Sequence, residues 1–175
     1  MTGIAGLGSL RRVFQRLVDF LYWHFRVHRI RSKRDFLWRV TLENIVVAIA
    51  VATPVIALGV PPRTDLDNLS HLELALAGCL FAPIFETLIF QAFPVMIVRM
   101  AGGGFRMCIV AGLVPFALAH FPSGIGTGVA VGIVGGFYLA FTYVNWRSES
   151  LSAALGMTIA LHALGNALAI LPLLL

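Results

Sequence analysis

Five apolar stretches follow one another along this chain, each close to the roughly 20 residues that a helix needs to cross the hydrocarbon core of a membrane. They are predicted at about 41–60, 73–97, 105–121, 125–146 and 151–171. The 175-residue chain is 59% apolar and only 12% charged, whereas about a quarter of the residues in soluble domains are charged. Because helices satisfy their own backbone hydrogen bonds in lipid, these stretches predict an all-α, polytopic membrane bundle of about five transmembrane helices.

The first 40 residues differ from the rest because they are basic and amphipathic. Apolar residues recur at helical spacing between residues 10 and 25, with arginines between them, which predicts a helix lying in the membrane interface. Nine of the 13 Lys and Arg residues lie in this segment. We expect their charge to contact anionic lipid headgroups, and we expect no nucleic-acid partner. The predicted domains are therefore an interfacial segment, 1–40, and a transmembrane bundle, 41–175.

Positive charge also predicts how the bundle is oriented in the membrane. If the N-terminus is cytoplasmic, Arg99, Arg106 and Arg147 fall in turns on the cytoplasmic side as well. Only Arg63 then lies on the opposite side. An odd number of spans places the C-terminus on that opposite side, so the predicted localisation is a multi-pass integral membrane protein with a cytoplasmic N-terminus.

Glu86 is a carboxylate in the middle of the second apolar span. An ionised side chain at this depth costs between about 3 and 15 kcal/mol, so such residues normally face a cavity and function there. His120 lies near the end of the third span, and His162 and Asn166 lie in the fifth, four residues apart and thus on one helix face. Four polar groups on three helices predict one shared polar site.

The chemistry of these residue types suits hydrolysis of a peptide bond. A carboxylate and an imidazole that share one water can act as a general base and position the nucleophile. Imidazole and amide N–H groups on another helix can donate to a developing oxyanion. This chemistry needs no cofactor. Alternatively, Glu86, His120 and His162 could hold a divalent metal such as zinc with an open position, so two ways of activating the water remain.

Three short patterns in this region carry a resemblance to a known family. They are Glu86-Thr-Leu-Ile-Phe-Gln91, Phe116-Ala-Leu-Ala-His120 and His162-Ala-Leu-Gly-Asn166, in this order on three apolar spans. Over about residues 73–171 the chain resembles the CPBP family of intramembrane proteases (Abi proteins), the bacterial relatives of the CAAX-processing endopeptidase Rce1.

The resemblance implies an intramembrane endopeptidase that cleaves a membrane-associated protein or peptide. It implies a glutamic-type mechanism in which Glu86 and His120 activate a water. His162 and Asn166 are implied to stabilise the oxyanion. The question of a metal comes with the resemblance, because the family has often been called a metalloprotease family.

The first motif departs from the family pattern, Glu-Glu-x-x-x-Arg, at two positions. Thr87 replaces the second Glu and Gln91 replaces the Arg. The two positions are four apart on one helix face, where the family residues could form an ion pair. Replacing both members of a buried ion pair by uncharged residues can leave stability nearly unchanged, whereas replacing only one leaves a buried charge without a partner. We therefore predict that Thr87 and Gln91 are supporting residues, whose side chains can still hydrogen-bond each other.

Two other classes of function compete with the protease. The neutral pair Thr87 and Gln91 favours a catalytically silent membrane scaffold or an immunity-type protein that retains the fold. A small transporter could use Glu86 and the histidines as a proton relay, but five spans without an inverted repeat argue against it. A serine mechanism is not expected, because the chain has no Gly-x-Ser-x-Gly motif.

Overall fold

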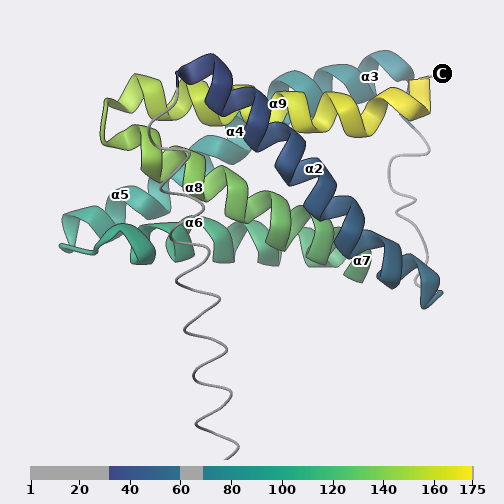
Figure 1. Ribbon diagram of the computed structural model, residues 1–175, viewed down its shortest axis with the longest axis horizontal. Coiled ribbons are helices and arrows are strands. Elements are labelled where there is room, and N and C mark those ends of the chain that lie inside the picture. The colour runs from purple at the N-terminus through teal and green to yellow at the C-terminus, as the bar shows by residue number, and fades with distance from the viewer. Residues whose placement is uncertain (1–31, 60–68, 175) are drawn as a thin grey trace, which may run out of the picture. The chain divides into compact units, whose positions relative to one another are not determined.

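The structure, a computed structural model, describes residues 32–59 and 69–174 of the chain (Figure 1). Within these ranges it contains helices and no strands. Five helical stretches are long and apolar enough to cross a membrane: Lys33–Ala57, His71–Met100, Phe105–Ser123, Ile125–Arg147 and Leu151–Leu171. The predicted all-α, polytopic fold is confirmed, and the protein is a multi-pass integral membrane protein.

The chain divides into two compact units, Met1–Phe36 and Leu37–Leu175, and the following description concerns the second unit. The amphipathic helix predicted between residues 10 and 25 lies outside the described residues. Its contact with anionic lipids stays a prediction, as does the cytoplasmic N-terminus. The first spanning helix starts at Lys33 and not near residue 41, so the end of the predicted interfacial segment is continuous with that helix.

Successive spans run in opposite directions across the view, joined by short connections wherever the connection is described (Figure 1). The first span is α2 (Lys33–Ala57). The second consists of α3 (His71–Leu76), η1 (Ala77–Phe81), α4 (Ala82–Glu86), η2 (Thr87–Ala92) and α5 (Phe93–Met100). The third is α6 (Phe105–His120) with η3 (Phe121–Ser123). The fourth joins α7 (Ile125–Thr127), η4 (Gly128–Gly135) and α8 (Gly136–Arg147), and the fifth is α9 (Leu151–Leu174).

The second span changes from α to π geometry twice, and a proline follows each π segment. Pro83 comes after η1 and Pro94 comes after η2. A proline lacks the N–H, and its ring clashes with the carbonyl four residues earlier, so a local π adjustment accommodates it within a membrane helix. Glu86 is the last residue of α4, between the two π segments. The widened turns therefore flank the carboxylate, and such turns are frequent at functional sites.

Glycines spaced four residues apart allow η4 and α8 to approach α6 closely. At Gly132, a Cβ atom would lie 3.1 Å from the Cα of Ala117 and 3.1 Å from the Cβ of His120. Such distances are tighter than ordinary van der Waals contacts, so only a residue without a side chain fits here unless the neighbours shift. Because lipid provides no hydrophobic drive for association, close packing of this kind is what holds membrane helices together.

Gly132→Ala is therefore expected to destabilise the bundle by about 1 to 3 kcal/mol, the usual cost of overpacking. Gly135→Ala is the matched control, because it adds the same methyl group in the same π segment where nothing lies within 4 Å. Thermal unfolding of the purified variants in one detergent measures the difference. Equal midpoints for the two variants would contradict the close approach of η4 to α6.

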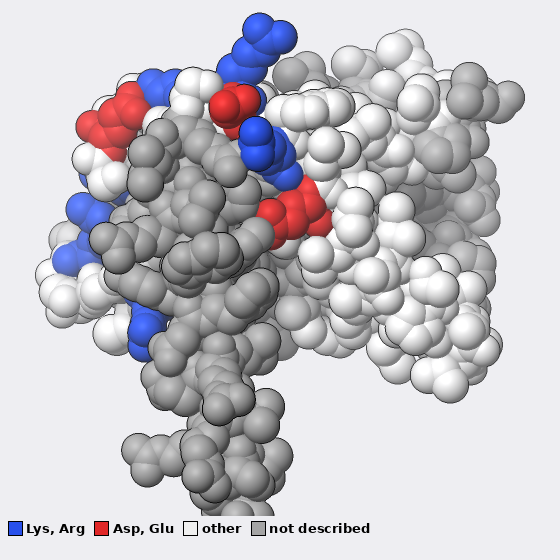
Figure 2. All heavy atoms as spheres, viewed as in Figure 1, with Lys and Arg blue, Asp and Glu red and all other residues white. Residues whose placement is uncertain are grey.

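A partly buried hydrogen bond joins α2 to α8. The Tyr138 hydroxyl donates to Glu43 Oε1 at 2.7 Å, which gives a second carboxylate within the spans a specific partner. Large apolar side chains of α2, among them Val46 and Ile49, are exposed as expected for a surface that faces lipid. Figure 2 shows the same character, since no charged side chain of the described residues is in view toward its right edge, where α2 ends.

Candidate active site

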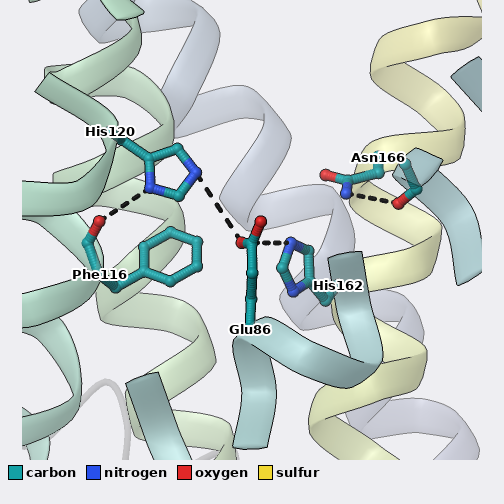
Figure 3. Close-up of polar contacts among 6 residues, drawn as sticks. Glu86, Phe116, His120, His162 and Asn166 are labelled. Carbon is teal, nitrogen blue, oxygen red and sulfur yellow. Dashed lines mark hydrogen bonds and ion pairs between the residues drawn. The ribbon is translucent and has the colours of Figure 1, made fainter. Parts of the chain in front are cut away.

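One cavity, of about 630 Å³, is lined by all four predicted polar groups: Glu86, His120, His162 and Asn166. Figure 3 shows Glu86 pointing between the rings of His120 and His162. One face of the second span lines the cavity. It is formed by residues spaced four apart: Gly78, Ala82, Glu86 and Phe90. Helices α6 and α9 provide the histidines and the asparagine. The four groups that were predicted to share one site thus line a single cavity.

The Glu86 carboxylate lies within ion-pairing distance of both imidazoles (Figure 3). Its Oε2 atom is 3.9 Å from His120 Nε2 and 3.7 Å from His162 Nε2. Both distances exceed those of a hydrogen bond. The Glu86 side chain is 28% exposed, whereas that of His162 is 6% exposed, so the carboxylate is the more accessible of the two groups.

The orientation of His120 is determined by its own helix. Its Nδ1 atom lies 2.8 Å from the backbone oxygen of Phe116. Because a carbonyl oxygen only accepts hydrogen bonds, Nδ1 carries the hydrogen and Nε2 of the neutral ring is an acceptor. The ring also stacks on the ring of Phe116, with centroids 4.3 Å apart. His120 therefore turns its Nε2 atom toward Glu86.

Phe116 has a structural role that sequence analysis did not assign to it. Its ring is 1% exposed. It stacks on His120 and makes an edge contact with His162 at a centroid distance of 5.8 Å. A phenylalanine four residues before a histidine shares its helix face, and this spacing is the signal that could have indicated the contact. Phe116 packs against both imidazoles of the site.

Asn166 links the site to the second span. Its side-chain amide donates to the backbone oxygen of Gly78 in η1 at 2.7 Å (Figure 3). An amide carries two hydrogens, so one remains for another acceptor. His162, one turn earlier on α9, is buried, and its Nδ1 atom has no hydrogen-bond partner in the described part of the chain. Asn166 thus holds α9 against η1, with His162 facing Glu86.

Comparison with protein families assigns the chain to a known group. Residues 68–168 match the family described as type II CAAX prenyl endopeptidase Rce1-like. This match covers more than half of the chain, including the four polar groups. The chain belongs to the Rce1-like family. Comparisons with curated proteins and with solved structures gave no match.

Membership of the Rce1-like family confirms the resemblance inferred from the three sequence patterns. The family is one of intramembrane CAAX proteases, and its substrates are membrane-associated proteins. Membership alone leaves the roles of individual residues in this chain to be argued from the geometry of the cavity.

Thr87 and Gln91, the two departures from the motif, lie away from the cavity. Both are fully buried on η2. The predicted hydrogen bond between them is wrong, because neither side chain hydrogen-bonds any described residue. Gln91 instead extends toward α6, where a Cβ atom on Gly112 would collide with its amide oxygen. Because Gly112 has no side chain, it leaves room for the Gln91 amide beside α6.

The three ionisable groups of the cavity do not match the spacing of a zinc site. Zinc ligands lie at about 2.0 to 2.2 Å from the metal, which in a tetrahedron separates neighbouring donor atoms by roughly 3.4 Å. The carboxylate-to-imidazole distances are 3.9 and 3.7 Å. Across residues 32–59 and 69–174, no group of three or more His, Cys, Asp or Glu side chains is arranged to hold a metal ion. The zinc alternative stays a prediction, and no step below uses it.

Proposed function

We propose that this Rce1-like protein is an intramembrane endopeptidase in which Glu86 and His120 activate a water. The observation that supports this most directly is the pair Glu86 Oε2 and His120 Nε2, 3.9 Å apart in one cavity. Both atoms accept hydrogen bonds, so a water can donate one hydrogen to each. Its lone pairs then point away from both groups and are free to attack a carbonyl carbon.

In this mechanism the water oxygen bonds to the carbonyl carbon while one of its protons passes to the Glu86 carboxylate. The carbonyl oxygen becomes an oxyanion. His162 and the remaining amide hydrogen of Asn166 are proposed to donate to it, because donors aimed at the developing charge lower the barrier most. When the intermediate collapses, the C–N bond breaks and the leaving amine takes the proton from Glu86.

The altered first motif is compatible with this activity. Thr87 and Gln91 are buried outside the cavity, so exchanging the family residues at these positions removes no group from the cavity wall. The substrate is expected to be a membrane-associated protein or peptide, because Glu86 lies near the middle of the span His71–Met100. The catalytically silent scaffold is the alternative outcome of the following test.

The test compares membranes containing the full-length wild type with membranes containing Glu86→Gln, by mapping the C-terminal peptides of membrane-associated proteins. At least one protein is expected to be cleaved only with the wild type. Glu43→Gln is the matched control, because it makes the same exchange outside the cavity and retains an acceptor for Tyr138. It is expected to preserve the wild-type cleavage pattern.

Identical peptide patterns for wild type and Glu86→Gln would reject the protease and favour the scaffold. Wild-type cleavage that is lost on chelation and restored by zinc would instead support a metal-bound water. Glu86, His120 and His162 would then be the ligands to examine.

A further inference from the structure

A second cavity, of about 490 Å³, lies at the end of the bundle where α5 ends and α8 passes into α9. Three polar residues line it, Arg99, Tyr143 and Arg147, and the remaining wall is mostly apolar. None of its lining residues belongs to the candidate active site. We call it the arginine groove.

Two positive charges meet around one phenol in this groove. Tyr143 is 2% exposed, and both Arg147 and Arg99 interact electrostatically with its hydroxyl group. Within the described part of the chain, neither guanidinium group forms an ion pair with a carboxylate. The groove therefore gathers positive charge that the described protein groups do not neutralise.

The apolar wall of the arginine groove is open to the side. Leu88, Phe93 and Met96 line it and are 42%, 58% and 49% exposed. Along the second span, Arg99 follows Leu88 by 11 positions, which corresponds to about 16 Å at 1.5 Å per residue. This length is close to half of the hydrocarbon core, which is about 30 Å thick. The groove thus has the depth of one membrane leaflet, with its charge at the outer end.

We propose that the arginine groove binds one anionic phospholipid. The lipid phosphate lies between Arg99 and Arg147, which match phosphate oxygens in charge and in donor geometry. The Tyr143 hydroxyl donates to the same group, and an acyl chain packs along Leu88, Phe93 and Met96. Basic pockets between transmembrane helices recognise anionic headgroups in this way.

The proposal does not depend on proteolysis, so binding can be measured without a substrate. Native mass spectrometry of the delipidated, full-length protein is titrated with phosphatidylglycerol and with phosphatidylcholine. The wild type is expected to prefer one phosphatidylglycerol about thirtyfold, since each of two arginines adds roughly a fivefold preference for an anionic lipid. Inorganic phosphate at millimolar concentration should not compete, because it lacks the acyl chain.

Two double variants test whether the arginine groove causes the preference for phosphatidylglycerol. Arg99→Gln with Arg147→Gln is expected to bind both lipids equally. Arg39→Gln with Arg106→Gln removes the same charge outside the groove and should keep the thirtyfold preference. The single variants Arg99→Gln and Arg147→Gln, each expected to retain about a fivefold preference, replace the first double variant if it does not fold.

Three results would overturn the proposal. In the first, the wild type binds the two lipids equally. In the second, both double variants lose the preference alike, which would indicate general surface charge. In the third, inorganic phosphate displaces the lipid, which would indicate a site for free phosphate.

Discussion

Glu86→Gln and His120→Asn are each expected to lower the rate of peptide cleavage about a thousandfold, within the usual range for general base catalysis. The double variant is expected to be no slower than either single variant. The reason is that the two acceptor atoms, 3.9 Å apart, hold the same water, so losing either one removes the whole arrangement. Asn at position 120 keeps a donor near Phe116 and removes only the acceptor that faces Glu86.

The measurement is the initial cleavage rate on a substrate found by peptide mapping, with thermal unfolding to show that each variant is folded. Glu43→Gln again serves as the control and should stay within a few-fold of the wild type. Losses that multiply in the double variant would show that Glu86 and His120 act in separate steps. A His120→Asn variant with the wild-type rate would remove His120 from the mechanism.

Gln91→Arg alone is expected to destabilise the protein by about 3 to 5 kcal/mol, because it buries a cation that has no opposite charge. Gln91 is fully buried and its amide already fills the space beside Gly112, so the longer arginine must also displace α6. Thr87→Glu combined with Gln91→Arg is expected to recover most of the lost stability, since the ion pair of the family motif can then form.

Thermal unfolding and the amount of protein recovered from membranes measure this difference. Thr87→Val with Gln91→Leu is a useful comparison, because it removes two polar groups that lack hydrogen bonds among the described residues and should be neutral or stabilising. If the single and double charged variants were equally unstable, the pairing argument for these positions would fail.

Apart from the start of the first span, which lies at Lys33 and not near residue 41, the spans could be predicted closely because hydropathy is a property of each segment by itself. The span predicted at 151–171 matches Leu151–Leu171, and the one at 125–146 matches Ile125–Arg147 to within a residue. The π segments next to Pro83 and Pro94 were not predicted. Proline marks where an α-helix is strained, but the way in which the strain is relieved depends on neighbouring helices.

Side-chain directions were predicted less well. Gln91 was expected to hydrogen-bond Thr87 on its own helix and instead extends toward Gly112 of α6. Asn166 was predicted to face the site, and its bond to the backbone oxygen of Gly78 was not predicted. In both cases the neighbouring residue is a glycine on another helix, which contributes a backbone atom or the space left by its missing side chain. The residue types along one segment therefore gave no indication of the contact.

By itself, the sequence determined that five helices span a membrane and that Glu86, His120, His162 and Asn166 are the polar groups to explain. It did so because length, hydropathy and the cost of a charge in lipid can be evaluated one segment at a time. Only the tertiary structure decided that these groups line one cavity and that His120 turns its Nε2 atom toward Glu86. Distances of a few ångströms depend on how closely helices pack, and here Gly132 sets that approach beside His120.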